Sequence, residues 1–483
     1  MNETKNKLTL WQKIGYGLGD IYGGGSGTLI SFYYLVFLTD VVRIRPALAG
    51  TVILISKAYD AITDPFEGVI ADRTRTRLGR RRPYLLAGIP LVFLSFFALF
   101  YPAPFDQELA RFAFVVATYL FFSTIVSIVM LNYNALQSEL TLDYDERTTL
   151  SSARIFFSTV GSIAAALAPM EIVQAFDSVR TGYVVMGLAF GTFFALPFIA
   201  TVVATRERPE FQRPPKAFDW RKTYLLPFKT KTFLYALLMY LFAFVAIDAV
   251  SSIVVYYMKY HLKRGDEVSF VNGTLLIVQV VSLPLFAWIS RRTNKRTGYI
   301  VGAAIWMAAM LLSGVITPTS PNWAVYVFAA IVGIGTGGIV VMIYAIFPDI
   351  PDVDELATGE RREGTYAALI TFVRKLSSAV AIFMVSNALS IAGYVAPVEE
   401  VVNGKSRLIE QAQSEAFIRT LRVVFAGAPI VLLALALVFA FRYPLTSEVH
   451  ARLRRLLAAR RLGEELNDTQ AAEATALKEK LIG

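Results

Sequence analysis

Three ionisable residues lie inside an apolar stretch near the start of the chain. Lys57, Asp60 and Asp64 fall within an apolar run that begins near Leu48 and resumes beyond Pro65. Because they stand three and four positions apart, a helix places all three side chains on one face. An ionisable group near the centre of a bilayer costs at least about 2.5–3.5 kcal/mol, so such groups normally face a wet interior and mark an ion or substrate path. We therefore interpret this face as a site for a coupling cation.

The two acids offer the oxygen ligands that a hard cation prefers. Pro65 has no N–H to donate to the carbonyl of Ala61, which leaves a further oxygen between the carboxylates. Such oxygens suit Na⁺ or Li⁺, and a carboxylate also accepts H⁺. The alternative is an ion pair in which Lys57 joins one acid and only locks helices together. One ammonium cannot neutralise two carboxylates, which favours the cation site.

The composition of the chain indicates a membrane protein. Of its 483 residues, 55% are hydrophobic and 17% charged, and the mean hydropathy is +0.52. About twelve apolar stretches reach the roughly 20 residues that a membrane helix needs. They are centred near residues 30, 58, 92, 122, 162, 192, 242, 277, 306, 335, 380 and 430. Only helices satisfy the backbone in lipid over such lengths, so we expect an all-α bundle of 12 transmembrane helices.

Positive charge alternates between the expected connections. Six arginines lie between positions 73 and 82 and eight basic residues between 206 and 231, whereas residues 102–112 carry one arginine. We expect the chain to lie in the plasma (inner) membrane. The positive-inside rule then places both termini in the cytoplasm. Two connections fit poorly, with Arg43 and Arg45 in one and Lys263 and Arg264 in the other. The overall bias survives them.

Similar loops recur six expected helices apart. The Arg-rich residues 72–82 are echoed by residues 290–298, and residues 143–148 by residues 349–364. This repetition predicts the major facilitator fold, with two parallel six-helix halves and a binding site at mid-depth. We expect the halves at residues 1–205 and 231–443, a cytoplasmic linker at 206–230, and a cytoplasmic tail at 444–483.

Four motifs, in order, resemble those of the glycoside-pentoside-hexuronide:cation symporter family. They are residues 59–65 (YDAITDP), the Arg-rich run to Pro83, residues 143–154, and residues 358–364 (TGERREG) followed by Phe372-Val-Arg-Lys375. The resemblance extends from about residue 10 to residue 443. It implies symport of a glycoside, pentoside or uronide with Na⁺ or H⁺, and no other cofactor.

The resemblance also implies particular ligands. Asp60 and Asp64 match the family's cation-binding acids, and Thr63 and Ser127 match two further oxygen ligands. Arg154 matches a substrate-contacting arginine, and Lys375 belongs to an Arg-Lys motif. The family's sugar-contacting residues, two acids and a tryptophan, are replaced by Gly24, Met130 and Asn134, but Asp20 lies one helical turn before the first of them. Lys57, Arg154 and Lys375 would suit an anionic sugar.

Other candidates for the substrate site come from the residues alone. Asp248 lies in an otherwise apolar helix, where it either contacts a cavity or pairs with a Lys or Arg of another helix. Four tyrosines are candidates for stacking on a sugar ring, although membrane aromatics more often serve packing; they are Tyr33, Tyr34, Tyr133 and Tyr344. Asn134 is the remaining polar candidate of this group.

The basic loops supply candidates for a cytoplasmic gate. Asp72, Arg73 and Arg77 of one half are expected to pair with Glu360, Arg361 and Glu363 of the other. Single exposed pairs contribute about 0–1 kcal/mol, but several together would bias a two-state equilibrium. For Arg75, Arg80 and Arg81 we favour a topological role alone.

Several further patterns point away from other functions. The GxGxxG at residues 333–338 follows no strand, which favours helix packing over nucleotide binding. His261 and His450 are the only histidines, so a metal cluster is not expected beyond the coupling cation. No plausible catalytic triad occurs, which argues against an enzyme. The net charge of +10 reflects orientation, not nucleic acid. Basic and apolar residues alternate from Val449 onward, which predicts an amphipathic helix resting on anionic lipid.

A monomeric secondary-active symporter of a small molecule, working by alternating access, is therefore the main hypothesis. Transport of a lysolipid or another amphiphile is an alternative, because a branch resembling this family carries lysophospholipids and the sugar-binding acids are replaced. A membrane sensor that does not transport is a further alternative. The intact acid pair and loop motifs argue against that last hypothesis.

Overall fold

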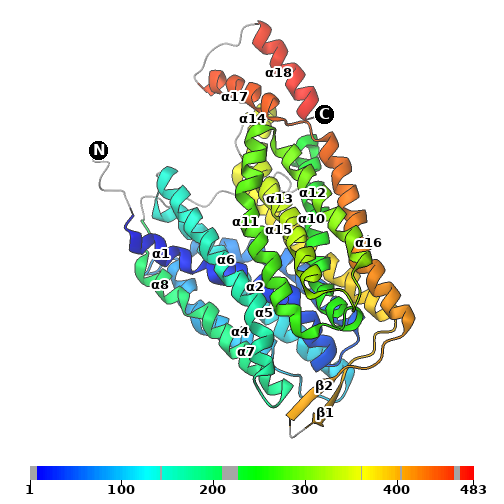
Figure 1. The fold of residues 1–483 in the computed structure, drawn as a ribbon. Helices are drawn as coiled ribbons and strands as arrows, with labels where there is room; N and C mark the ends of the chain where they lie inside the picture. The colour runs from blue at the N-terminus through cyan, green and yellow to red at the C-terminus, as the bar shows by residue number, and fades with distance from the viewer. Residues whose placement is uncertain are drawn as a thin grey trace. The chain divides into compact units, whose positions relative to one another are not determined.

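The computed structural model describes residues 8–141, 144–208, 227–359, 362–402, 405–461 and 468–482. The greater part of the predicted linker, residues 209–226, lies outside the described residues, as do Glu360 and Arg361. Almost all of the rest is helical (Figure 1). A helix covers every one of the twelve expected centres, which confirms the predicted all-α membrane fold.

The helices of the first part of the sequence run to residue 204. They are α1 (Leu10–Leu18), α2 (Asp20–Leu29), α3 (Pro46–Arg73), α4 (Arg82–Leu99), α5 (Glu108–Leu140), α6 (Tyr144–Gln174), α7 (Val179–Ala195) and α8 (Pro197–Ala204). Two π-helical segments, η2 (Ile30–Tyr34) and η3 (Phe37–Val41), extend α2.

The later helices begin after the linker. They are α10 (Lys231–Tyr256) with the π-helical η6 (Tyr257–His261), α11 (Val268–Arg292), α12 (Lys295–Leu312), α13 (Asn322–Ile346), α14 (Ile350–Thr358), α15 (Glu363–Ile391), α16 (Glu415–Arg442), α17 (Ser447–Arg461) and α18 (Asp468–Leu481). A hairpin of strands β1 (Val398–Val402) and β2 (Lys405–Ile409) precedes α16, with Val398 opposite Ile409.

Local sequence signals explain where several helices begin. Thr9 caps α1 and forms a capping box with Gln12. The side chains of Ser178 and Asn294 cap α7 and α12 in the same way, by accepting a backbone N–H. Pro46 occupies the first turn of α3, where its missing N–H costs nothing.

Ten helical runs among the described residues are long and apolar enough to cross a membrane. The other two expected spans are helical as well. One is interrupted where α1, α2 and the π-helical segments succeed one another, and the other, α3, carries Lys57, Asp60 and Asp64. The charged residues that predict a cation site therefore also explain why α3 is less hydrophobic than the ten apolar runs.

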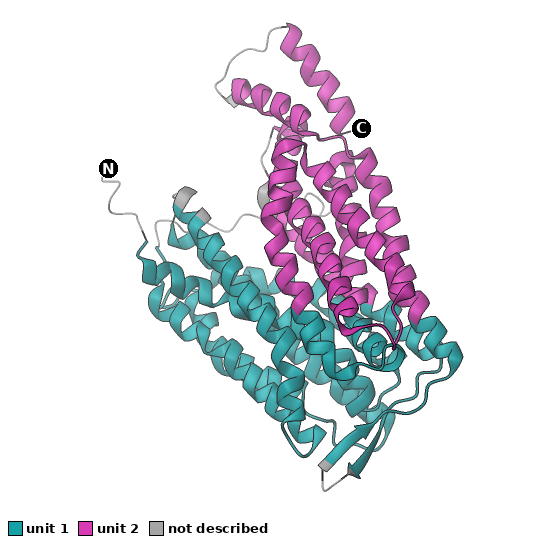
Figure 2. Cartoon of the chain, in the orientation of Figure 1, with its two compact units in different colours: residues 1–216, 251–273, 382–421 teal, residues 217–250, 274–381, 422–483 magenta. Residues whose placement is uncertain are grey.

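The chain forms two compact units (Figure 2). Unit 1 comprises residues 1–216, 251–273 and 382–421, and unit 2 comprises residues 217–250, 274–381 and 422–483. Unit 1 thus contains the whole first half of the sequence and the ends of four later helices. The two sequence halves proposed from the repeated loops stay a prediction.

Small residues allow close packing within each unit. In unit 1, α2 packs along α6, and a Cβ on Gly25 would come within 2.9 Å of the carbonyl oxygen of Gly161. In unit 2, α12 packs along α13, and a Cβ on Gly335 would lie 2.7 Å from that of Trp306. The GxGxxG of α13 is thus buried helix-packing surface.

The tail forms helices, but its apolar face is not available to lipid. Val449, Leu453, Leu456 and Leu457 of α17 are at most 5% exposed. The face packs on α14 and α18, and the Nε2 of His450 lies 2.9 Å from a carboxylate oxygen of Asp352. The expectation of a membrane-resting helix is therefore wrong for this face, because protein already buries it.

Candidate cation and substrate sites

Asp60 lies between two helices of unit 1 and is 1% exposed. Its Oδ2 is 2.9 Å from the Nζ of Lys57, one turn earlier on α3. The hydroxyl of Ser123 on α5 donates to the carboxylate, at 2.8 and 2.9 Å from its two oxygens. The Nζ of Lys57 also lies 3.4 Å from the hydroxyl of Ser123. Asp60 is therefore a buried charge held by an ammonium and a hydroxyl across the α3–α5 interface.

The register of α3 and α5 places the other predicted ligands. Arg45 pairs with Glu108, and Asp60 with Ser123, at the same separation of 63 residues. The two helices therefore run in the same direction, and this separation sets Ser127 opposite Asp64. Thr63 is half-buried on α3, and its hydroxyl donates to the carbonyl of Tyr59 at 3.1 Å. Its lone pairs remain suitable for a cation.

Lys57 is a partner of Asp60 in this structure. The Lys57 side chain is 17% exposed and that of Asp60 2% exposed. The ion pair that we considered as an alternative thus forms. A buried carboxylate needs compensation, and either an ammonium or a bound cation supplies it.

A second cluster in unit 1 gathers four of the predicted substrate residues. Arg154 on α6 donates to the Oδ1 of Asn134 at 2.6 Å and lies 3.4 Å from the carboxylate of Asp20. Its guanidinium also lies over the ring of Tyr133, 5.1 Å from the centroid. Tyr133 stacks on Tyr16 with ring centroids 4.8 Å apart. Helices α1, α2, α5 and α6 thus build one site of hydrogen-bonding groups. Tyr133 itself is fully buried against Tyr16 and Arg154, so the expectation that its ring stacks on a sugar is wrong for this structure.

Tyr34 does not belong to this cluster. Its side chain is fully buried and its ring packs on Phe37, Phe100 and Tyr119. The expectation that Tyr34 stacks on a substrate is wrong for this structure, because neighbouring aromatic side chains cover its ring.

Asp248 pairs with an arginine of a neighbouring helix in unit 2. The guanidinium of Arg374 on α15 approaches both carboxylate oxygens, and its Nη2 lies 2.9 Å from Oδ1. The sequence left open a cavity contact or a Lys or Arg partner for Asp248 and named no partner. From the Arg-Lys motif it selected Lys375, as a substrate residue. Arg374, the other member of that motif, was missed because adjacent helical residues point about 100° apart and no periodicity distinguished them.

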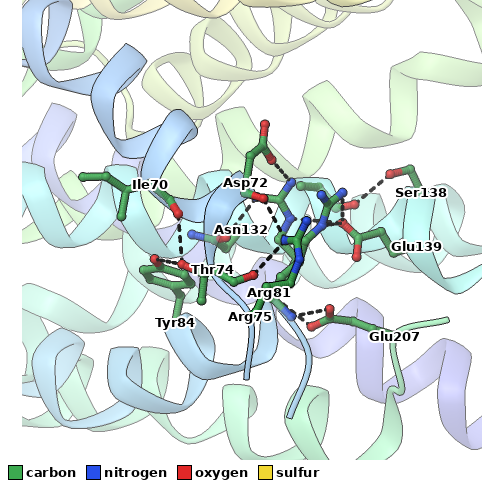
Figure 3. Close-up of polar contacts among 12 residues, drawn as sticks. Ile70, Asp72, Thr74, Arg75, Arg81, Tyr84, Asn132, Ser138, Glu139 and Glu207 are labelled. Atoms are coloured by element: carbon green, nitrogen blue, oxygen red, sulfur yellow. Dashed lines mark hydrogen bonds and ion pairs between the residues drawn. The ribbon is translucent and has the colours of Figure 1, made fainter. Parts of the chain in front are cut away.

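The Arg-rich loop of unit 1 folds into a buried ion network (Figure 3). The guanidinium groups of Arg80 and Arg81 lie 2.7 and 3.1 Å from the carboxylate of Glu139, and Arg81 also pairs with Asp72. Glu207 accepts the backbone N–H groups of residues 80, 81 and 82 at 2.6–2.8 Å, at the start of α4. An anion is stabilised at such a helix N-terminus.

This network corrects part of the interpretation of the loop. Arg80 and Arg81 are 7% and 5% exposed, so they are structural residues and not topology signals alone. Arg75 is exposed and donates to the carbonyls of residues 72 and 74. Asp72 pairs within unit 1, and Arg73 and Arg77 are exposed. Of the expected partners, Glu360 and Arg361 lie outside the described residues, as does the side chain of Glu363.

The opposite end of unit 1 carries a polar cluster that the sequence did not predict. Asp40 is 1% exposed; its carboxylate lies 3.3 Å from the Nζ of Lys259 and accepts the hydroxyl of Tyr394 at 2.6 Å. Thr39 hydrogen-bonds both Asp40 and Tyr256, each at 2.7 Å. These residues come from η3, α10, η6 and the loop after α15. A lone Asp beside Thr at a helix end carries no sequence signal for such a cluster.

The β-hairpin is attached beside this cluster. The backbone N–H of Ser406 donates to the carbonyl of Asp177 at 2.6 Å, and Arg180 pairs with Glu399 at 3.2 Å. A hydrogen bond from the Ser406 hydroxyl, followed by the charge of Arg180, lowers the pKa of Glu399. The segments after α6 and α15 are thus joined by a polar contact.

Comparison with known proteins gives the family. The sequence profile of the MFS/sugar transport protein family matches residues 15–447. The chain is 30% identical to the uncharacterised symporter YjmB of Bacillus subtilis, over 93% of this chain and 96% of that protein. It is 25% identical to the isoprimeverose transporter of Lactiplantibacillus pentosus, over 90% of this chain and 89% of that protein.

A solved structure supports the fold. The nucleoside transporter NupG superposes with a TM-score of 0.58 at 14% identity, covering 89% of this chain and 98% of NupG. This likeness concerns the architecture alone. The predicted fold class and family are both confirmed. The chain therefore belongs to the MFS/sugar transport protein family and is a multi-pass integral membrane transporter, not an enzyme, with the major facilitator fold.

Proposed function

We propose that this protein couples the movement of a sugar, glycoside or uronide to that of Na⁺ or H⁺. The observation that carries the proposal is the buried Asp60, whose carboxylate meets an ammonium and a hydroxyl at the α3–α5 interface. The names of the relatives YjmB, a symporter, and the isoprimeverose transporter support it. The expected ligands of the cation are Asp60, Asp64, Thr63 and Ser127, with Ser123 added by the geometry.

The proposed coupling step is an exchange of partners at Asp60. Without a bound cation, the ammonium of Lys57 compensates the carboxylate, at 2.9 Å. A cation that binds to the acid pair takes over this compensation and releases Lys57. Since one ammonium cannot neutralise two carboxylates and an unpaired buried charge is costly, the site that holds substrate closes only when the cation is in place.

The substrate is proposed to bind at the Arg154 cluster. Asp20 and Asn134 accept hydrogen bonds and Arg154 donates them. Such convergent polar groups fix the orientation of a bound ligand. Ser123 and Asn134 lie on the same helix, about 16 Å apart along its axis. A shift of α5 would therefore be felt at both sites.

The arrangement in the cell is part of the proposal. We place the Arg-rich end of unit 1 and both termini in the cytoplasm, with the chain in the plasma membrane, on the basis of loop charge. The Asp40 cluster then lies at the outer end of unit 1.

The test is uptake into proteoliposomes that contain the purified chain. Radiolabelled methyl glucoside, galactoside and xyloside, glucuronate and galacturonate are offered with an inward Na⁺ gradient, an inward H⁺ gradient or none. The proposal expects accumulation of at least one sugar above equilibrium with one gradient. Flux of labelled lysophosphatidylcholine with no sugar flux, or no flux of any of these compounds, would contradict it.

A further inference from the structure

The Asp248–Arg374 pair of unit 2 lies in a membrane region and is not part of the proposed cation site. We propose that this pair, with Phe244 and Tyr344, forms a second subsite that binds the hydroxyl groups of a sugar ring. The inference rests on the proposed function and specifies how the second part of the sequence would recognise the substrate.

The pair has a definite geometry. Asp248 stands near the middle of the α10–η6 run and its side chain is 2% exposed. Arg374 approaches it with both terminal nitrogens, so two N–H groups are aligned with two carboxylate oxygens. This two-point contact fixes the plane of the guanidinium. It thereby also fixes the direction of the N–H groups that do not contact Asp248.

Part of the pair must face water. The Arg374 side chain is 33% exposed, although α15 is long and apolar enough to cross a membrane. An exposed guanidinium within a membrane helix faces a water-filled interior and not hydrocarbon, because solvation by lipid tails is too costly. A pair that only joined two helices would also gain little over packed apolar side chains. The exposed edge is therefore available to a solute.

Aromatic rings complete the site. The guanidinium of Arg374 lies 4.6 Å from the ring centroid of Phe244, so one of its flat faces is covered. Tyr240 and Tyr344 surround Phe244 at 4.4 and 6.1 Å, and Tyr344 of α13 is 50% exposed. The carbon–hydrogen face of a sugar packs on an exposed aromatic ring, while its hydroxyls use the polar groups beside it.

The charge of the pair selects the kind of ligand group. Asp248 already compensates the positive charge of Arg374, so the partly exposed Arg374 offers hydrogen-bond donors without net charge on the pair. Hydroxyl oxygens accept from such donors. A carboxylate at the same place would compete with Asp248 for the guanidinium and be repelled by it. We therefore expect the subsite to take the hydroxylated side of the substrate and not an acidic group.

The test measures binding selectivity in the full chain. Dissociation constants are measured by calorimetry in lipid nanodiscs for the matched probes methyl glucoside and glucuronate, methyl galactoside and galacturonate, and methyl xyloside, in 100 mM NaCl. Wild type is compared with Asp248→Asn, Arg374→Gln and Tyr344→Ala. Asp354→Asn, which disrupts another buried Asp–Arg pair of unit 2, with Arg362, is the matched control.

Asp248→Asn leaves an uncompensated guanidinium, so we expect the affinity for the acid relative to its neutral counterpart to rise about 10-fold. Arg374→Gln should lower this ratio, and Tyr344→Ala should weaken the neutral sugars about 10-fold. Because Tyr344 is half-exposed, its variant tests the subsite even if the charge variants fail to fold. The subsite would be overturned if the acid-to-neutral affinity ratios of the charge variants and the sugar affinity of Tyr344→Ala all equalled those of wild type. Sugar binding by wild type would in that case still uphold the proposed function. Binding of no probe by wild type would overturn both.

Discussion

Burying the Asp60 carboxylate within the membrane costs free energy, which the nearby side chains of Lys57 and Ser123 offset. The spacing of 57, 60 and 64 was sufficient to predict that these charges share a face, because helical geometry is fixed by sequence separation. Ser123 could not be predicted, since α5 carries several hydroxyl residues and only the contact with α3 selects one. For the same reason the sequence could not tell which member of the Arg-Lys motif, Arg374 or Lys375, pairs with Asp248: only the contact between the helices selects one.

The exchange of partners at Asp60 leads to a prediction for Lys57→Met. Without the tethered ammonium, a cation no longer has to displace a competitor, so the cation concentration for half-maximal stabilisation should fall several-fold. The measurement is the shift of the unfolding temperature with added NaCl, or with pH at constant NaCl. The matched control is Lys13→Met, which removes the lysine of the Lys13–Glu146 pair elsewhere in unit 1. An unchanged or higher half-maximal concentration in Lys57→Met would argue against competition.

At the scale of elements, the twelve apolar stretches predicted the membrane helices because length and hydropathy suffice for a helix in lipid. The ends of the helices were less predictable. The β-hairpin lies in a loop of mixed composition and its strands have five residues each, which gives little periodic signal. The burial of α17 against α14 depends on a tertiary contact that amphipathicity alone cannot distinguish from a membrane surface.

The start of α4 depends on Glu207. Its carboxylate accepts three consecutive backbone N–H groups, and a hydrogen bond to a charged group contributes about 1.5–3 kcal/mol. Glu207→Gln should therefore lower the unfolding temperature in nanodiscs, with a loss of stability of about 1–3 kcal/mol. Glu479→Gln, at an exposed position of α18, is the control. Equal unfolding temperatures for the two variants would show that the cap is unimportant.

The attachment of the hairpin should depend on pH. Because the pKa of Glu399 is lowered in the folded chain, ionised Glu399 contributes stability above about pH 4.3, the ordinary pKa of glutamate. This contribution is lost as the pH falls through the lower folded-state pKa. A nitroxide on Val401→Cys, which is unique because the chain has no cysteine, should become more mobile from pH 5 to pH 3. In the labelled Val401→Cys chain, a second substitution Glu399→Gln should make the nitroxide mobile at every pH, whereas Glu400→Gln should keep the change between pH 5 and pH 3. If the nitroxide of labelled Val401→Cys alone has the same mobility at every pH, the prediction is wrong.

At the scale of the whole molecule, the repeated loops predicted the major facilitator fold, and the family comparison confirms it. The segments that make up unit 1 could not be predicted, because the ends of later helices join it through tertiary contacts. In the alternating access that we propose, these ends separate from the first half of the sequence in another state. Among the described residues, the Asp40 cluster joins these ends to the first half of the sequence through Lys259, Tyr256 and Tyr394.

We therefore expect Asp40→Asn to favour release of these ends. Removing one partner of a buried ion pair costs about 3–5 kcal/mol, enough to shift a balanced two-state equilibrium. Spin labels at Phe105→Cys and Val401→Cys, both exposed in unit 1, should show a longer distance population by pulsed electron paramagnetic resonance. Lys259→Met should do the same, and Asp106→Asn, in an exposed loop, should not. Identical distance distributions in Asp40→Asn and the parent would show that the Asp40 cluster does not hold these helix ends.

The most direct test of cation coupling at Asp60 and Asp64 is transport by the Asn variants. In proteoliposomes, Asp60→Asn and Asp64→Asn are each assayed for uptake of the sugar that wild type accumulates, with a cation gradient and by equilibrium exchange without one. We predict that gradient-driven accumulation is lost while exchange of the sugar persists, because the substrate cluster around Arg154 is intact. Accumulation that remains cation-dependent in both variants would contradict the assignment of the coupling site.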